Sequence, residues 1–491
     1  MHRRMLMTTM SLALAGGMSA GGAVTLNPNG LGQALVYPYY TVNKGQDSLL
    51  VLTNASDLGK AARVRFHEGY NGRVVLDVLV LLSPHDRWTA AITAASGDET
   101  AGAKLVTHDR SCTLPAFPAG GQAFSSANYV GGGVAPYDQP DSGPQTIART
   151  REGHIDVVAD GDIVPGSATD ELVRHVQTGF ADQGSPACAA LDLAHVGQDL
   201  VAPTNTLGGS VGIVNVASGT YFSYEAQALA DFTQVPFVDT GATVGYDDLA
   251  RANSGNGVAS ATVFTDRGVA SIDFAQGIDA VSAVFMAETV HNDVLLDPAL
   301  GAATDWVLTF PTRRYYVDGQ RYAGTPRAPF THLFANGEAP VTIGWTLYDN
   351  EELDVSDPCG PICGVPPPQA DLTSPYEVNV IGFQPVDRAP PTTSDVFGSH
   401  LAKNLGATYP DWTSGQADLY LAADADQAPL MGTSAGTPVA LAGLPVAGFM
   451  AYDIINAHAQ PGLLANYSGT FAHRKRVTCS SSVVDPPVPC S

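Results

Sequence analysis

The sequence is poor in basic residues. It has 24 Lys and Arg against 48 Asp and Glu, which gives a formal net charge of −24. Neutralising nucleic-acid phosphates or anionic lipid headgroups requires clustered Lys and Arg, so the composition argues against both kinds of partner. Hydrophobic residues nevertheless make up 45% of the 491 positions, which is enough for a core and excludes a mainly disordered chain.

Long apolar runs are also missing. No stretch approaches the ~18–20 uninterrupted apolar residues of a membrane-spanning helix. The first residues instead resemble a secretory signal, with Arg3 and Arg4, a short run rich in Ala and Leu, and small residues ending near Ala23. We therefore expect a signal peptide over 1–23, the general secretion route, and a mature chain in the periplasm, at the cell surface or outside the cell. A frayed first helix is the alternative interpretation.

Cysteines are few, but their number is even. Six cysteines in an exported chain are typical of disulfides. A zinc site at the C-x-x-x-C spacing near residue 360 is the alternative, but it would need a second close ligand pair, and the sequence shows none. Proximity along the chain favours three disulfides: Cys359–Cys363, Cys479–Cys490 and, by remainder, Cys112–Cys188.

What the sequence does have is turn residues, with 51 Gly and 34 Pro, and hydrophobic alternation with a period of two. Residues 48–53, 62–67, 73–82 and 88–93 have strand composition and are separated by short turn motifs. This spacing predicts a mainly β fold, with β-sandwiches of immunoglobulin-like or jelly-roll type, long loops and a few short helices.

The predicted organisation has four parts after the signal. We expect an N-terminal β-sandwich over 24–235, with a long inserted excursion at about 94–208 that holds helices near 169–180 and 186–196. A central β region follows over 236–348, with one of its strands over 314–317. An acidic Pro-rich hinge covers 349–370. Strands over 371–491 complete a sandwich.

One catalytic motif is present in outline. Ser434 lies in a Gly-x-Ser-x-Gly sequence, the pattern of a nucleophile elbow. His458 or His473 could act as its base, and Asp453 could orient that base. The elbow needs a helix after the turn, whereas Pro438 follows closely here and more Gly and Pro come after it. We therefore predict no catalytic residues and keep these four side chains as candidates.

Two protease-like loops are also incomplete. Asp239-Thr-Gly resembles loops of the subtilisin-like and aspartic proteases. The former family needs a parallel α/β sheet, whose alternation of strands and helices is missing here. The latter needs two carboxylates that share a proton, and the other matching tripeptide, at Asp141, lies in a polar Pro-rich stretch. Turns are the simpler interpretation of both.

A cluster of acids suggests a cation site. Carboxylates suit Ca²⁺, which is abundant outside cells, although the cluster does not have the EF-hand pattern and could be a solvated loop. We expect no cofactor and no metal, with a structural Ca²⁺ at this cluster as the alternative. Its five acids lie within nine residues: Asp349, Glu351, Glu352, Asp354 and Asp357.

Two groups of tyrosines could form a binding surface. The first covers 37–40, and the second comprises Tyr315 and Tyr316 with Tyr322 nearby. Exposed on a β surface, such rings could stack on sugars or contact a protein. Half-buried positions in strands are the alternative.

Four strings carry a resemblance: GQALVYPYYT (32–41), VRFHEGYN (64–71), DWVLTFPT (305–312) and ANYSG (465–469). Together they resemble a group of exported proteobacterial proteins of similar length. The resemblance covers nearly the whole chain after the signal and implies export, but no activity or site residue.

The sequence therefore predicts an exported, non-enzymatic, β-rich protein of the cell envelope or extracellular space that binds an unknown protein or glycan. The alternatives are a secreted serine hydrolase that uses Ser434 and a glycan-binding module that uses the tyrosines.

Overall fold

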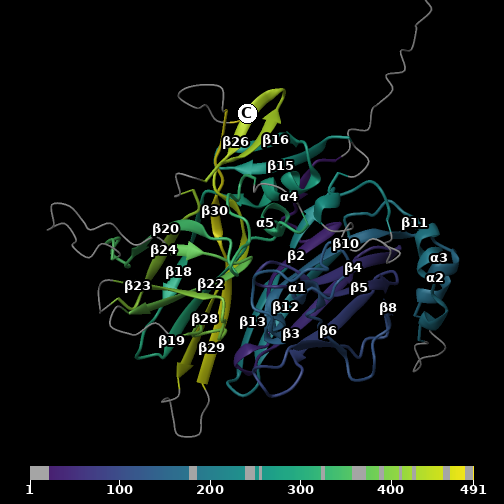
Figure 1. The fold of residues 1–491 in the computed structure, drawn as a ribbon, viewed down its shortest axis with the longest axis horizontal. Helices are drawn as coiled ribbons and strands as arrows, with labels where there is room; N and C mark the ends of the chain where they lie inside the picture. The colour runs from purple at the N-terminus through teal and green to yellow at the C-terminus, as the bar shows by residue number, and fades with distance from the viewer. Residues whose placement is uncertain are drawn as a thin grey trace, which may run out of the picture.

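The computed structural model describes residues 22–175, 185–237, 249–253, 257–321, 327–355, 372–385, 392–407, 412–422, 427–456, 465–481 and 490 (Figure 1). Strands dominate, which confirms the mainly β prediction. No helix in this part of the chain is long and apolar enough to cross a membrane. The helices are short: α1 (Ala127–Val130), α2 (Ala168–Val173), α3 (Leu193–Gln198), α4 (Gly277–Phe285) and α5 (Arg314–Val317).

Thirteen strands form the large sheet. In spatial order they are β31 (Cys479–Ser481), β26 (Thr437–Leu441), β25 (Leu430–Ser434), β16 (Gly268–Phe274), β15 (Ala259–Thr265), β1 (Val24–Leu26), β14 (Gln227–Ala230), β2 (Ala34–Thr41), β10 (Glu152–Ile163), β4 (Gly59–Glu68), β5 (Val74–Leu82) and β8 (Cys112–Leu114), with β11 (Leu200–Val201) beside β10.

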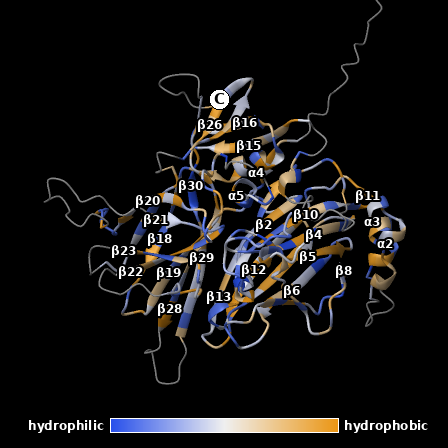
Figure 2. Ribbon diagram, viewed as in Figure 1, coloured by the Kyte–Doolittle hydropathy of each residue, from blue (hydrophilic) through white to orange (hydrophobic). Residues whose placement is uncertain are grey.

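Six strands form a second sheet, here called the grooved sheet. Their order is β13 (Thr220–Glu225), β12 (Leu207–Asn215), β3 (Asp47–Asn54), β6 (Arg87–Ala94), β7 (Ala103–Val106) and β9 (Gln122–Ala123). Alternation along β3 and β6 turns Leu50, Leu52, Trp88 and Ile92 inward onto β2, β4 and β10 of the large sheet. The two sheets thus form a sandwich, and Figure 2 shows apolar and polar residues alternating along many strands.

Two five-stranded sheets form the second half of the molecule. The inner sheet is β23 (Ala402–Ala407), β22 (Val378–Pro385), β19 (Ala302–Thr309), β28 (Ala447–Asn456) and β29 (Ala465–Ala472). The outer sheet is β21 (Leu372–Ser374), β20 (Val341–Tyr348), β24 (Ser414–Tyr420), β18 (Thr289–Leu295) and β30 (Arg474–Arg476), and β17 (Met286–Ala287) pairs with β27 (Leu444–Pro445).

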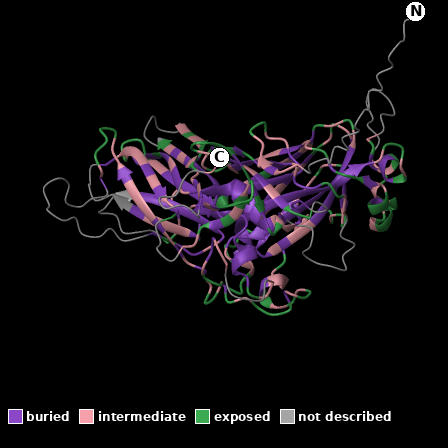
Figure 3. Cartoon of the chain, turned by 90° about the horizontal axis from the view of Figure 1, so that it is seen from above, coloured by how far each residue is buried: buried purple, intermediate pink, exposed green. Residues whose placement is uncertain are grey.

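The inner sheet is covered on both faces. Trp306 and Met450 belong to the core shared with the outer sheet, while Val307 and Phe449 belong to the core of the first sandwich. Figure 3 shows the result, with buried residues running through the interior strands and exposed residues mainly in peripheral loops. The two halves therefore share one continuous interior.

Two sequence expectations need correction. The inserted excursion at about 94–208 contains β10, which is buried along its whole length and pairs with both β2 and β4 at the centre of the large sheet. The strand expected over 314–317 is the single helical turn α5, all of whose residues are buried. A single turn sends adjacent side chains in different directions, so that each finds its own buried partner, and these tertiary contacts override the strand propensity of the two tyrosines.

A buried ion network attaches the segment before β10 to β4. The Arg149 side chain is fully buried and donates from Nε and Nη2 to Glu68, at 2.6 and 2.9 Å. Its Nη1 and Nη2 atoms donate to the two oxygens of Asp141, at 2.8 and 2.7 Å. Burial by itself raises the pKa of Asp141, but the hydrogen bonds and charge of Arg149 lower it overall. One guanidinium therefore compensates two buried carboxylates.

We predict that Arg149→Met destabilises the fold by about 3–5 kcal/mol, because it leaves Glu68 and Asp141 buried without their main counter-charge. Urea unfolding at pH 7 measures the change. Arg267→Met is the matched control, since Arg267 is exposed on a turn and should change stability by less than ~0.5 kcal/mol. Equal losses in the two variants would contradict the role given to Arg149.

Candidate functional site

The Ser434 motif forms a hairpin rather than a nucleophile elbow. Ser434 ends β25 and faces Thr437 of β26, with Ala435 (φ 47°) and Gly436 (φ 80°) as the two turn residues. A strand follows this turn, where an elbow needs a helix. Asp453 lies on β28, in the inner sheet and not in the large sheet that holds Ser434.

His473 is buried against Trp306, with ring centroids 5.1 Å apart. Its Nε2–H donates to the Val307 carbonyl at 3.0 Å, and its Nδ1 accepts from the Asn292 amide at 3.1 Å. Both ring nitrogens are therefore engaged, and neither is available to accept a proton from a serine. His458 lies outside the described residues. The structure thus does not bring Ser434, Asp453 and His473 together.

The acidic loop is organised by its own backbone. Asp349 Oδ1 accepts the N–H groups of Glu351 and Leu353, and Glu352 has a φ of 68°. Asp357 lies outside the described residues, and Asp354 forms a bridge with Tyr348 of β20. In the described part of the chain, one group of three His, Cys, Asp or Glu is compact enough for a metal ion, and it lies elsewhere, in the large sheet.

The described residues form two disulfides. Cys112–Cys188 joins β8, at the edge of the large sheet, to the segment between α2 and α3. Cys479–Cys490 joins β31 to the chain end. Both pairs are among the three expected from proximity, and Cys359 and Cys363 lie outside the described residues. Each bridge attaches a loop or terminal segment to the large sheet.

The two tyrosine groups lie in the interior. Tyr37, Tyr39 and Tyr40 are 0% exposed on β2, and Tyr315 and Tyr316 of α5 are nearly as buried. Burial raises the pKa values of Tyr39, Tyr40 and Tyr316 well above the usual value of 10.0, so these rings stay neutral. Tyr322 lies outside the described residues. The tyrosines that the sequence singled out and the structure describes are therefore core residues and not a binding surface.

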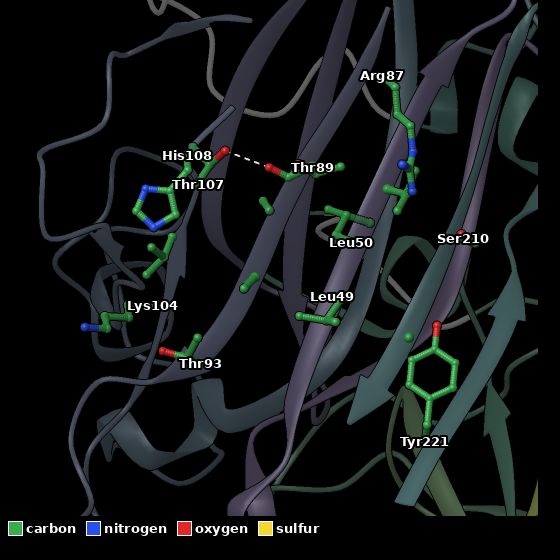
Figure 4. A pocket seen from close by; sticks show the side chains of 15 residues that line it. Leu49, Leu50, Arg87, Thr89, Thr93, Lys104, Thr107, His108, Ser210 and Tyr221 are labelled. Carbon is green, nitrogen blue, oxygen red and sulfur yellow. Dashed lines mark hydrogen bonds between the residues drawn. The ribbon is translucent and has the colours of Figure 1, made fainter. Parts of the chain in front are cut away.

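An open groove of about 590 Å³ lies on the outer face of the grooved sheet, within the volume range of small-molecule sites (Figure 4). Side chains alternate along a strand, so every second residue of each strand lies on this face. The residues between them pack against the large sheet. The lining side chains are mostly small or hydroxylated. They include Val51, Thr89, Ala91, Thr93, Val106, Thr107 and Ser210.

Two larger apolar side chains stand on this face. Tyr221 of β13 is 54% exposed, and Leu49 of β3 is 40% exposed. The Tyr221 ring lies against the backbone of β12 at Gly212, where an added Cβ would come within 2.5–2.8 Å of three ring and hydroxyl atoms. Gly212 therefore lets the ring lie along the floor of the groove, with its other face open to a ligand.

The charge of the groove is opposite to that of the chain. Its lining includes Arg87, Lys104 and His108, but no Asp or Glu. Arg87 and Lys104 form no ion pair with any described residue, so their charges are available to a ligand. The chain has twice as many acidic as basic residues, so a groove whose charged side chains are all cationic differs clearly from the average charge of the chain.

One edge of the grooved sheet is closed by side chains. Ser468 Oγ of β29 accepts from the Tyr221 N–H at 3.0 Å and donates to the Tyr221 carbonyl at 2.8 Å. Thr470 Oγ1 donates to the Ser223 carbonyl in the same way. These bonds satisfy the free edge of β13, so an extended peptide cannot add there as another strand. A ligand is left with the open face of the sheet.

Sequence reasoning missed the groove residues. The alternation Thr220-Tyr-Phe-Ser-Tyr-Glu was visible and would have placed Tyr221 on the exposed face of a strand. The convergence of Arg87, Lys104 and Tyr221 had no local signal, because β12–β3 and β3–β6 pairing is long-range.

The environment of His473 predicts acid sensitivity. Burial, assisted by the charge of Lys475, lowers the pKa of His473 to about 3 from 6.5. Between these two values only the unfolded state takes up the proton, so stability is complete above about pH 6.5 and falls as the pH drops toward 3. The slope is about 1.4 kcal/mol per pH unit.

We therefore expect urea unfolding of the native protein to lose about 2 kcal/mol between pH 7 and pH 5 through this residue. His473→Gln should unfold more easily at pH 7 but lose less on acidification. The exposed His108→Gln variant should keep the native pH slope. An unchanged slope in His473→Gln would contradict the assignment.

No family model, no curated protein and no solved structure matches this chain.

Proposed function

We propose that this protein is an exported, non-enzymatic binding protein whose groove takes an acidic oligosaccharide or a segment of an acidic polysaccharide. One observation carries the proposal: the groove is lined by Arg87, Lys104 and His108 without any carboxylate, in a chain of formal charge −24. Carboxylate or sulfate groups on a sugar would pair with these cations.

The other lining groups suit a sugar rather than an apolar ligand. Hydroxyls of Thr89, Thr93 and Ser210 lie beside small apolar side chains on the face of the sheet. Sugars have hydroxyl groups around a ring whose faces carry C–H groups, and Tyr221 offers an exposed aromatic face for such a ring. The groove therefore combines stacking, hydroxyl contacts and positive charge.

Export is part of the proposal. It is supported by the signal-like start of the chain, by the two disulfides, and by the resemblance to exported proteins. Polysaccharides of the cell envelope and the extracellular space are the acidic sugars that such a protein would meet. The sandwich that carries the groove is proposed to be of immunoglobulin-like or jelly-roll type.

We predict that oligogalacturonate, an acidic sugar, binds and that neutral maltooligosaccharide of equal length does not, as measured by isothermal titration calorimetry. Arg87→Ala/Lys104→Ala should weaken binding more than tenfold, because a hydrogen bond to a charged group contributes about 1.5–3 kcal/mol. Tyr221→Ala should weaken it about threefold to tenfold through lost ring stacking.

Arg267→Ala/Arg474→Ala is the control, because it removes two exposed cations far from the groove lining and changes the net charge equally. This control should bind as the native protein does. The proposal fails if neutral and acidic sugars bind alike, or if the two double variants lose the same affinity.

A further inference from the structure

Two histidines and an aspartate meet inside the large sheet, on the face that is turned away from the grooved sheet. His67 of β4 and His154 of β10 are directly opposite each other in the ladder. Their rings stack with centroids 4.6 Å apart and an interplanar angle of 11°. Asp156 lies two residues further along β10 on the same face, and all three side chains are 0–2% exposed.

The hydrogen bonds of His67 fix its tautomer. Its Nδ1 lies 2.8 Å from the Gly72 carbonyl, which can only accept, so Nδ1 carries the proton. In the neutral ring the Nε2 atom then has a lone pair and can act as a metal ligand. Metal-bound histidines commonly donate their other ring N–H to a backbone carbonyl in this way.

That lone pair faces another acceptor. His67 Nε2 is 3.3 Å from Asp156 Oδ2, and a neutral ring that is protonated at Nδ1 has no proton to donate to this oxygen. Within the described residues, His67 Nε2 and Asp156 Oδ1 receive no hydrogen bond. Buried polar atoms are rarely left in this state. A cation bound between His67 Nε2 and Asp156 would satisfy both atoms.

We propose that His67, His154 and Asp156 bind one divalent transition-metal ion, with Zn²⁺ favoured by the ligand types. One ligand atom from each of the three lies within 4.8 Å of the others. Tetrahedral ligands at ~2.0–2.1 Å from zinc are about 3.3–3.4 Å apart. The His67–Asp156 pair is already at 3.3 Å, and His154 Nε2 is 3.8 Å from Asp156 Oδ1.

Arg314 is the neighbouring cation. It contacts Asp156 Oδ2, donates to His154 Nε2 at 3.1 Å, and donates to Glu377 Oε1 at 2.7 Å. The ion would share both Asp156 and His154 with this guanidinium, while Glu377 and the Pro311 carbonyl, at 2.9 Å, hold Arg314 from the other side. The two carboxylates, Asp156 and Glu377, offset Arg314 and one of the two charges of the ion.

A pocket adjoins the site. It has a volume of about 290 Å³ and is lined by His67 together with Asp77, Asn128 and Tyr137, and also by Arg65, Arg321 and several apolar side chains. Carboxylate, amide and hydroxyl oxygens in this pocket can replace the water shell of an entering cation. The site is therefore buried in the sheet but adjoins a pocket at His67.

The experiment uses the mature protein without a polyhistidine tag, loaded with Zn²⁺, dialysed and analysed by inductively coupled plasma mass spectrometry. We expect about one zinc ion per chain and a melting temperature that falls when EDTA removes it. Crystals of the loaded protein should show a zinc anomalous peak between His67 and Asp156. Absence of bound zinc, or an anomalous peak only at another place, would overturn the proposal.

The matched variants are His67→Asn and His195→Asn. An asparagine amide can still donate to the Gly72 carbonyl, but it lacks the Nε2 ligand, so His67→Asn should lose the zinc. His195 is exposed on α3, and its variant should keep one ion per chain. Full retention of zinc by a folded His67→Asn protein would overturn the proposal. If that variant does not fold, the anomalous peak of the native protein decides.

Discussion

Arg314 connects the two halves of the molecule, and much of the architecture depends on it. β10 is buried on both faces, yet one face carries His154 and Asp156. A buried charge costs several kcal/mol unless it is paired, so the chain must bring a cation to this strand. Arg314 of α5 supplies it and also pairs with Glu377, at the start of the inner sheet. The inner sheet is thereby held in one position on the large sheet.

Other buried polar contacts also fix the sheets to one another. Glu152, at the start of β10, accepts from Tyr39 Oη, Ser399 Oγ and the His400 N–H. Asp305 of β19 accepts the Phe397 N–H, and burial raises the pKa of this carboxyl to about 7. These bonds join segments far apart in the sequence. The outer face of the grooved sheet stays uncovered by these contacts and by the apolar core.

Local patterns predicted the parts of the fold that depend on local chemistry. The apolar run of β3 and the turn motifs around β3 and β6 are visible in the sequence, and both strands lie where the sequence placed them. The central position of β10 could not be predicted, because its sequence, EGHIDVVADGDI, places acids and a histidine on one face. Such a face is typical of a solvent-exposed strand. The distant Arg314 compensates Asp156, and Lys60 and Arg63 of β4 pair with Asp162 and Asp160, so the acids of β10 are tolerated in the interior. For the same reason α5 could not be recognised, because its polar partners lie up to 160 positions away.

The strong acidity of the chain sets limits on the ligand that its groove can hold. The formal charge of −24 repels a polyanion at long range, whereas Arg87 and Lys104 attract it only within the groove. Screening at physiological salt confines the repulsion to about 8 Å. The proposed ligand, a short acidic oligosaccharide, would lie within the cationic face and gain the attraction. A long polymer must also cross surface where acids outnumber bases. The arrangement therefore favours short acidic segments or chain ends over long uninterrupted polyanions, and nucleic acid, with its charge on every residue, is disfavoured most.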